Sequence, residues 1–425
     1  MDLTDTREEG EFRQRVRAWL LDHAEPRRGF ETWAGRHGES EGLRRARDFQ
    51  AKKAAAGLTG LTWPRQYGGQ GLAPIFQVIL QQEEARYFVP RGYFEIGLGM
   101  CLPTMLAYAT EEQKRRYGPP ALTGEEIWCQ LFSEPAAGSD LAGLRTRAER
   151  DGADWVINGQ KIWTSGAHFS DWGVIVTRSD PRAPKHKGLT YFFLDMRSPG
   201  IEVRRIRQIS GASNFNEVYF TDVRVPDGQR LGRVGEGWGV SITTLMNERL
   251  AVGDVRGPDV DELLDLCRTL PLEDGPAIAN AAVRERLAGW YCRTQGLRYT
   301  RFRAMTALSR GQTPGPENSI GKLVSASKLQ EIATFALDLL DMGGVVMDPT
   351  LAPMRAAFQE ALLYSPGGRI AGGTDEILRN IIAERVLGLP ADVRTDRDVP
   401  FDEVPSGRDV DGRPGRAPAA SAPSR

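Results

Sequence analysis

The sequence predicts an α+β multidomain fold in which helices, then strands, then helices again follow one another along the chain. Two observations support this order. Apolar residues recur at helical spacing before residue 125 and after residue 235. Between these limits, short runs of β-branched and aromatic residues alternate with Gly, Pro and Asp, a pattern typical of strands and turns. We therefore expect a helical domain over 1–125, a β-domain over 126–235 and a helical bundle over 236–392.

The first region is predicted to be helical because its apolar residues share one face. Phe12, Val16 and Leu20 are spaced by one helical turn. Similar spacing predicts helices over residues 78–86 and 103–116. These segments together predict a helical domain with a core of its own.

The middle region contains the strongest short hairpin signal in the chain. In residues 155–163, "WVINGQKIW", Asn158-Gly159 stands between two apolar runs, and Asn-Gly favours the tight turn of a β-hairpin. Further strands, each bounded by Gly, Pro or Asp, are expected over residues 172–179, 189–196, 201–206 and 216–225. This many strands at this spacing suggest a small barrel or sandwich.

The third region returns to helical periodicity. Helices are expected over residues 238–252, 281–310, 319–341 and 375–387. In the third of these segments, an apolar stripe typical of a bundle core comprises Leu329, Ile332, Ala333, Ala336 and Leu340. Residues 393–425 are rich in Pro, Gly, Asp, Arg and Ser, so we expect a disordered tail there.

Composition excludes several classes of protein. The chain has 425 residues, with 55 Lys and Arg against 56 Asp and Glu, so no basic surplus argues for a nucleic-acid or anionic-membrane partner. Its four cysteines are widely spaced, which fits free thiols in a reducing compartment. Its four histidines have no metal-ligand spacing, so no metal site is expected. The acidic N-terminus and the lack of a long apolar run predict a cytoplasmic protein with no membrane span.

Three short stretches have features of ligand-binding segments. Residues 130–140, "QLFSEPAAGSD", and 160–166, "QKIWTSG", combine hydroxyls with aromatic residues, although each alone is equally typical of a structural loop or strand end. Residues 369–380, "RIAGGTDEILRN", pair two glycines with a helix opener, so a helix N-terminus there can meet an anionic ligand. By contrast, the glycines of 235–239, "GEGWG", do not have the spacing of a dinucleotide loop.

Together these motifs make the sequence resemble the acyl-CoA dehydrogenase family. The matching segments are "FSEPAAGSD", "NGQKIWTSGA", "RQISGASNFNEVYFTDVRVP" and "GGTDEILRNIIAERVLGLP", and the resemblance covers roughly residues 5–390. It implies a bacterial FAD-dependent member with an N-terminal α-helical domain, a middle β-barrel or sandwich and a C-terminal four-helix bundle. It also implies oxidation of an acyl-CoA substrate to 2-enoyl-CoA by α-proton abstraction and β-hydride transfer to flavin N5, with electrons passed to an electron-transfer flavoprotein.

The resemblance further implies which residues contact the cofactor. These residues are Gln130, Phe132, Ser133, Ser139, Trp163, Thr164, Ser165, Gly343, Gly344, Gly373, Thr374 and Asp375. Trp163 would pack on the flavin ring, and Ser139 would also lie beside the CoA arm. The glycine pair 343–344 would touch the FAD of a neighbouring subunit. Because a carboxylate repels phosphates, Asp375 is expected to contact the ribose or adenine rather than the phosphates.

The catalytic base is expected at Glu248. Many relatives carry the catalytic Glu where this chain has Gly372, whose N–H can still polarise the thioester oxygen. The long-chain and isovaleryl enzymes carry it on the first bundle helix, at the position of Glu248. A lone helical Glu is by default solvated, but the missing carboxylate at 372 favours the catalytic role. Arg249 follows it, as an Arg does in most relatives, with either a substrate-side or a structural ion-pair role.

One departure from the family pattern bears on assembly. Many relatives contact FAD across a subunit interface through Arg-x-x-Phe-Gly, and this chain has no Phe-Gly dipeptide. A homodimer or homotetramer is expected, and a heterotetramer with a related chain is the alternative. Two rival functions stay open: a flavin-dependent oxidase or monooxygenase on the same fold, and a non-enzymatic scaffold or DNA-associated relative. The balanced charge argues against DNA binding.

Overall fold

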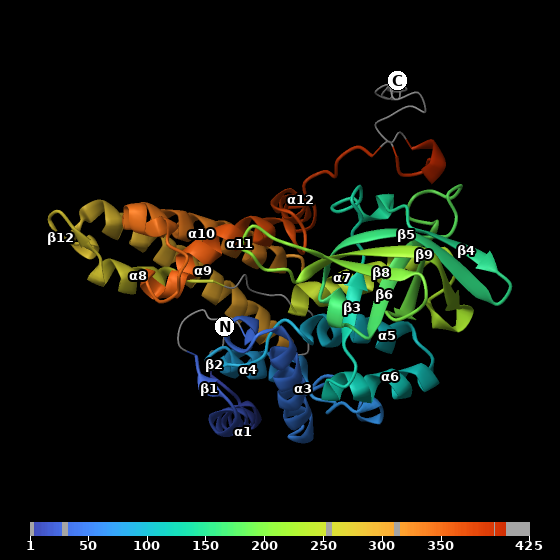
Figure 1. The fold of residues 1–425 in the computed structure, drawn as a ribbon, viewed down its shortest axis with the longest axis horizontal. Coiled ribbons are helices and arrows are strands. Elements are labelled where there is room, and N and C mark those ends of the chain that lie inside the picture. The colour runs from blue at the N-terminus through green and yellow to red at the C-terminus, as the bar shows by residue number, and fades with distance from the viewer. Residues whose placement is uncertain (1–3, 28–32, 252–256, 310–314, 395, 405–425) are drawn as a thin grey trace.

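The computed structural model describes residues 4–27, 33–251, 257–309, 315–394 and 396–404. In these residues helices precede an eight-stranded sheet and further helices follow it, which confirms the predicted α+β fold class. Figure 1 shows the sheet at one end of the molecule, the long C-terminal helices at the other, and the N-terminal helices below. No helix in the described ranges is long and apolar enough to cross a membrane.

The N-terminal part is helical, as predicted. Its helices are α1 (Arg7–His23), α2 (Trp33–His37), α3 (Glu39–Ala55), α4 (Pro74–Glu84), α5 (Leu102–Tyr108) and α6 (Glu111–Thr123). A π-helical turn over Gly97–Cys101 leads directly into α5. The expected stripe of Phe12, Val16 and Leu20 is buried and packs with residues of α4.

The single helix predicted over 103–116 is wrong, because the chain breaks it into α5 and α6. Ala109 is extended, and Thr110 begins a new helix. The Thr110 hydroxyl accepts from the Gln113 N–H at 3.3 Å, while the Gln113 side chain accepts from the Thr110 N–H at 2.9 Å. This capping box stabilises a helix start where apolar spacing alone showed none.

The middle part is built on one sheet. Its strands are β3 (Trp128–Leu131), β4 (Arg147–Asp151), β5 (Asp154–Ser165), β6 (Trp172–Arg178), β7 (Leu189–Asp195), β8 (Ile201–Ile206), β9 (Phe215–Pro226) and β10 (Arg230–Leu231). Their order is β10-β7-β6-β4-β5-β9-β8, and β3 pairs in parallel with β6. Strands β6 to β9 confirm the four segments predicted after residue 170, whereas β3 and β4 were not predicted.

The hairpin predicted at Asn158-Gly159 is wrong, because β5 runs straight through this dipeptide. The Asn158 side chain pairs with Asp222 of β9, with bonds of 3.0 and 2.9 Å. A Cβ at Gly159 would lie 2.5 Å from the Thr146 Oγ1 and 2.7 Å from its Cα. The glycine is therefore required by the close approach of Thr146, the residue before β4, and the turn falls instead at Gly152, where φ is +61°.

The C-terminal part is a set of packed helices. They are α7 (Gly237–Ala251), α8 (Val260–Thr269), α9 (Ala281–Ser309), α10 (Asn318–Leu340), α11 (Ala357–Ile370) and α12 (Asp375–Arg385). The predicted apolar stripe on α10 is buried, which confirms it as bundle core. Helices α8 and α11 were not predicted.

Part of the tail predicted to be disordered is instead ordered against the sheet, where Figure 1 shows it passing over the β-domain. Asp396 forms an ion pair with Lys185. The Phe401 ring covers the Arg178 guanidinium at 3.7 Å, and the Phe401 N–H donates to the Ala183 carbonyl at 3.0 Å. The prediction is therefore wrong for residues 396–404, because the β-domain offers cations that this segment binds. The remainder of the predicted tail, 405–425, lies outside the described residues.

Candidate active site

The motif residues of the β-domain meet where β3 ends and β5 ends. Gln130 lies in β3, and Phe132 and Ser133 follow that strand. The Ile162 N–H in β5 donates to the Ser133 carbonyl at 2.9 Å, so this loop runs beside residues 163–165. The structure thus brings the two predicted flavin segments together. Ser139 is exposed in the same loop, farther along the chain.

Trp163 and Thr164 have the features expected of residues that face a bound ring. The Trp163 backbone has φ of +60°, and its side chain is 55% exposed. A left-handed backbone is uncommon for a bulky residue and marks a constrained position. Thr164 is 1% exposed, yet its Oγ1 has no hydrogen-bond partner among the described residues. An exposed aromatic plane beside an unpaired buried hydroxyl fits a flavin ring, which needs an apolar wall and a few fixed polar groups.

A buried ion pair holds this loop in place. Lys161 is fully buried, and its Nζ donates to Glu134 Oε1 at 2.8 Å and to the Phe132 carbonyl at 3.0 Å. Glu134 also accepts from the backbone N–H groups of Arg145 at 2.6 Å and Thr146 at 2.9 Å. Burial opposes ionisation of Glu134, but the Lys161 charge and these hydrogen bonds outweigh it and lower the pKa of Glu134. Burial lowers the pKa of Lys161.

A second set of polar groups supports the end of β5 from the N-terminal domain. Asn216 is fully buried and donates to the Thr164 carbonyl at 2.8 Å. Its Oδ1 lies 3.0 Å from His168 Nδ1, and His168 Nε2 lies 2.8 Å from Glu39 Oε1 of α3. Arg205 donates to the other Glu39 oxygen at 2.7 Å, and its hydrogen bond is the main reason that the pKa of Glu39 is lowered. The backbone beside the candidate flavin position is therefore fixed by two domains.

The glycine turn before α12 is held by Lys322 of α10. Gly372 and Gly373 have φ of +67° and +99°, which favours glycine at both positions. The Lys322 ammonium donates to the carbonyls of Arg369 and Gly373. Thr374 caps α12, since its hydroxyl accepts from the Ile377 N–H at 3.3 Å. The turn that would present the Gly372 N–H is thus rigidly connected to the bundle.

Asp375 is paired with an arginine, which changes how its charge acts. Asp375 is 3% exposed, and its Oδ2 accepts from Arg369 Nε at 2.7 Å. Arg369 also donates to Gln330 at 2.9 Å. The other carboxylate oxygen, Oδ1, has no partner among the described residues. The arginine offsets the repulsion that a free carboxylate would exert on phosphates, and Oδ1 remains free to accept from a hydroxyl.

The structure does not bring Gly343 and Gly344 to this turn. They lie in the turn Asp341–Val345 after the C-terminal end of α10, whereas Lys322 stands near its N-terminal end. Because an α-helix rises 1.5 Å per residue, Lys322 and the turn Asp341–Val345 are about 30 Å apart along α10. Within one chain these glycines therefore do not share a site with the turn at 372–375.

The predicted base lies on α7. Glu248 and Arg249 belong to this helix, but their side chains lie outside the described part of the structure. The helix packs against β7, against α5 and against the π-helical turn, so it joins all three parts of the chain. The helix that carries position 248 is therefore held between the other two parts of the chain.

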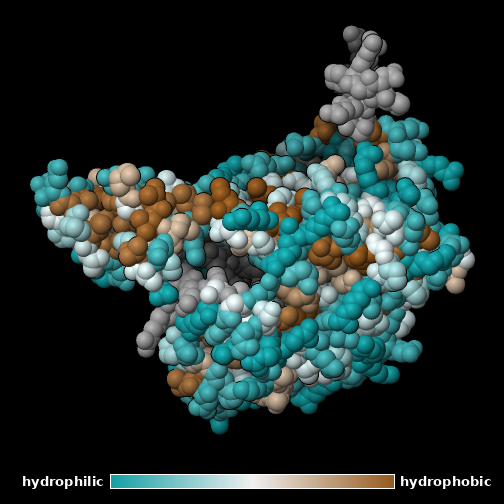
Figure 2. Space-filling view, viewed as in Figure 1, coloured by the Kyte–Doolittle hydropathy of each residue, from teal (hydrophilic) through white to brown (hydrophobic). Residues whose placement is uncertain are grey.

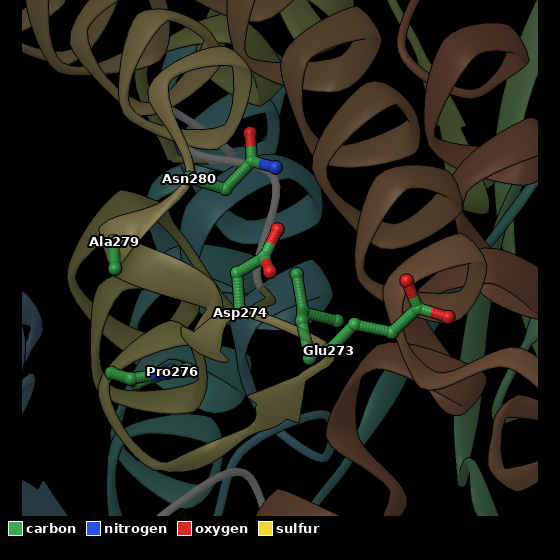
Figure 3. A pocket seen from close by; sticks show the side chains of 7 residues that line it. Glu273, Asp274, Pro276, Ala279 and Asn280 are labelled. Carbon is green, nitrogen blue, oxygen red and sulfur yellow. The ribbon is translucent and has the colours of Figure 1, made fainter.

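A pocket elsewhere is separate from these residues. It lies at the hairpin of β11 (Pro271–Leu272) and β12 (Gly275–Pro276) and is lined by Glu273, Asp274 and Asn280 among others (Figure 3). Glu273 and Asp274 are acidic, and none of the described residues that line the pocket is basic. No cluster that could hold a metal ion occurs within the described ranges. This pocket therefore adds nothing to the candidate active site.

Four supporting residues were missed by sequence reasoning: Lys161, Glu134, Asn216 and Lys322. The alternation in β5 carried a signal for the first of them. Trp155 and Ile157 face the core, and Lys161 lies an even number of residues from both, so strand alternation predicts a charged residue at a buried position. A charge in such a position requires a partner, and Glu134 supplies it. Nothing in the sequence indicated the partners of Asn216 or Lys322.

Comparison with known proteins agrees with this arrangement. Models of the acyl-CoA dehydrogenase N-terminal, middle and C-terminal domains match residues 6–125, 129–223 and 235–387. The chain is 41% identical to acyl-CoA dehydrogenase FadE34 of Mycobacterium tuberculosis over 343 residues, which are 80% of this chain but 46% of that protein, so it spans about half of that relative. It is 38% identical over 392 residues to acyl-CoA dehydrogenase IpdE1 of the same organism, covering 90% of this chain and 98% of that one. It also resembles the solved "Tcur3481-Tcur3483 steroid ACAD", with a TM-score of 0.77, 26% identity and coverage of 92% and 100%. The chain therefore belongs to the acyl-CoA dehydrogenase family.

Proposed function

We propose that this chain oxidises an acyl-CoA thioester to the 2-enoyl-CoA, with Glu248 as the base that removes the α-proton. The observation that carries the proposal is the exposed Trp163 beside the unpaired Thr164 hydroxyl, on a loop fixed by a buried ion pair. Enzymes of this family are FAD-dependent oxidoreductases, and these residues fit the isoalloxazine ring. When bound, FAD supplies the acceptor for the β-hydride.

The cofactor-contacting roles divide between the two rigid parts of the site. Gln130, Phe132, Ser133 and the segment 163–165 would hold the ring. On the bundle side, residues 373–375 would hold the ADP part, where the start of α12 favours negative charge and Asp375 Oδ1 can accept from a ribose hydroxyl. The fully buried Lys161 fixes the first part and the partly buried Lys322 fixes the second before any ligand binds, which lowers the entropy cost of binding.

The thioester would lie between the glycine turn and α7. The Gly372 N–H would donate to the thioester oxygen and stabilise the negative charge that develops when the α-proton leaves. Gly372 has no side chain, so the base has to come from another element. Glu248 supplies a carboxylate on the helix that packs against the β-domain. Arg249 beside it would either orient the substrate or pair with a carboxylate, and Ser139 would lie along the CoA arm.

The substrate is proposed to be a CoA thioester with a large, polycyclic or branched acyl group, and the electron acceptor an electron-transfer flavoprotein. The solved relative that this chain matches along its whole length is named a steroid acyl-CoA dehydrogenase. A plain fatty acyl thioester is the alternative.

A complete FAD site is proposed to need a second chain. Gly343 and Gly344 lie about 30 Å from the turn at 372–375 along α10, so they would serve the neighbour's cofactor. Figure 2 shows apolar residues gathered along the bundle, and beyond α10 Met342, Val345 and Leu351 are each about three-quarters exposed. A homodimer or homotetramer satisfies this geometry. A heterotetramer does so equally, and the name of the steroid relative joins two components.

A panel of acyl-CoA thioesters tests the reaction. Straight, branched, aromatic and steroid side-chain thioesters are added to the anaerobic holoenzyme, and bleaching of the flavin band is followed. Bleaching by at least one thioester, with formation of the 2-enoyl product, is the expected result. Stable oxidised flavin with every thioester, in protein that carries one FAD per chain, would contradict the proposal. Oxygen consumption without an added acceptor would favour the oxidase or monooxygenase alternative.

Native mass and FAD content test the assembly. A dimer or tetramer with one FAD per chain is expected if the chain assembles with itself. Less than half a flavin per chain, without activity, would instead favour a heteromeric enzyme whose second component is missing.

A further inference from the structure

Three buried hydroxyls meet where the three parts of the chain join. They belong to Thr104 of α5, Tyr191 of β7 and Thr244 of α7, and each residue is fully buried. Thr104 Oγ1 lies 2.9 Å from Thr244 Oγ1, which lies 2.9 Å from the Tyr191 hydroxyl. Their surroundings are otherwise apolar and include Leu102, Met105 and Val240. Buried hydroxyls in such a place require a reason, because apolar residues would pack there without polar constraints.

Every hydroxyl of this cluster has a hydrogen-bond partner. Thr104 Oγ1 donates to the Met100 carbonyl at 2.9 Å, and Thr244 Oγ1 donates to the Val240 carbonyl at 3.2 Å. Thr244 Oγ1 also lies 2.9 Å from both the Thr104 and the Tyr191 hydroxyls. Burial raises the pKa of the Tyr191 hydroxyl well above its usual value, so it remains a donor throughout the working pH range. The chain of bonds ends in the π-helical turn over Gly97–Cys101, a feature that is frequent at functional sites.

The cluster fixes how α7 is rotated about its axis. Thr244 and Glu248 are four residues apart in this helix, so the two positions lie on the same face, one turn from each other. A side chain ends about 5–6 Å from the helix axis, so a 10° rotation would move it by about 1 Å. A misplacement of that size at a reacting group can lower a rate about a hundredfold.

We propose that Tyr191, Thr244 and Thr104 are positioning residues that hold α7 in the rotation that places the base at position 248. This inference rests on the proposed dehydrogenase function. It assigns to this buried cluster the task of setting the position of the base through α7. It also explains why polar groups persist in the core between the three domains.

Variants of Thr244 test the proposal, and the chain supplies a matched control. Tyr108 and Thr243 form a similar hydroxyl contact of 3.1 Å between the same two helices, but at the surface. Thr244→Val should lower kcat about ten- to a hundredfold, with KM changed less than threefold and FAD content unchanged. Thr244→Ser, which keeps the hydroxyl, should restore kcat to within threefold. Thr243→Val and Tyr108→Phe should stay within twofold of the parent.

A triple variant guards against a failure to fold. Thr104→Val, Thr244→Val and Tyr191→Phe together remove all three hydroxyls, which leaves no polar group unpaired and is therefore tolerated better than a single removal. Loss of kcat with normal FAD content would support the proposal. A kcat within twofold of the parent would overturn it. Glu248→Gln, assayed in parallel, distinguishes the role of Glu248 as base from the positioning role of the cluster. If only Glu248→Gln is inactive, Glu248 is supported as the base and the positioning role is refuted. If Glu248→Gln is active, both roles are refuted.

Discussion

Replacing Lys161 with Met tests whether the buried ion pair fixes the flavin loop. The change leaves Glu134, which is 8% exposed, without its cation, and leaves the Phe132 carbonyl without its donor. Removing one partner of a buried pair costs about 3–5 kcal/mol, because the remaining charge stays desolvated. The expected result is a loss of stability of that size, together with weaker FAD retention, since Phe132 and Ser133 lie in the same loop.

Lys161→Met is compared with Glu134→Gln and with the double variant in a double-mutant cycle. Gln keeps one acceptor for the Thr146 N–H but loses the bond to the Arg145 N–H. The double variant Lys161→Met/Glu134→Gln removes both charges, so it should be more stable than Lys161→Met alone by at least about 1 kcal/mol. Such a recovery would show that the cost comes from the stranded carboxylate and not from the altered side-chain volume.

The assay combines urea denaturation followed by circular dichroism with the flavin absorbance that remains after gel filtration. Lys161→Arg serves as control, because it keeps the charge while changing the shape. The proposed role of the ion pair is refuted if the free energy of unfolding of Lys161→Met lies within about 1 kcal/mol of that of the parent, or if the variant retains FAD as well as the parent does.

Four further substitutions have outcomes that follow from the structure. Phe401→Ala should lower the thermal unfolding midpoint by a few degrees, because the Phe401 ring covers the buried Arg178 and such a contact is worth about 1–2 kcal/mol. An unchanged midpoint would show that residues 396–404 contact the β-domain without stabilising the fold. Asp227 accepts hydrogen bonds from an arginine and a tryptophan, which lower its pKa from 3.8 to about 2. The ionised carboxylate therefore stabilises the fold by about 1 kcal/mol after solvent screening above pH 4, and this stabilisation is lost as the pH falls toward 2. Asp227→Asn should flatten that part of the pH–stability curve. Gly159→Ala should destabilise by about 2–4 kcal/mol through its clash with Thr146. Gly289→Ala, in the open interior of α9, should instead stabilise by up to about 1 kcal/mol, and equal effects would disprove the close-approach argument.

The sequence predicted the fold class because helical and strand periodicities reflect which face of an element is buried. It failed where a local signal had another cause. Asn158-Gly159 has the composition of a turn, but here the glycine allows the close approach of Thr146, and the asparagine bonds across the sheet to Asp222. Residues 103–116 continue one apolar pattern, yet a capping box at Thr110 starts a second helix within it.

The sequence motifs predicted which residues form the candidate site, but they did not predict the contacts that hold these residues in place. Trp163 and Thr164 were identified in this way, and the structure adds the exposure of one and the unpaired hydroxyl of the other. The partners that hold them are far away in sequence: Asn216 lies 52 residues from Thr164, and Lys322 lies 51 residues from Gly373. Such contacts depend on the three-dimensional arrangement of separate domains, so no local pattern announces them.

The most direct measurement of the central claim is the rate of flavin bleaching by Glu248→Gln with FAD bound. A single turnover is followed anaerobically with the best thioester from the panel, and the parent and Glu248→Asp are measured beside it. Gln keeps the size of the side chain but cannot accept the α-proton, so the rate should fall by at least about a thousandfold while FAD content and substrate binding are kept. Bleaching at a rate within tenfold of the parent would show that another group removes the proton, and that Glu248 is not the base.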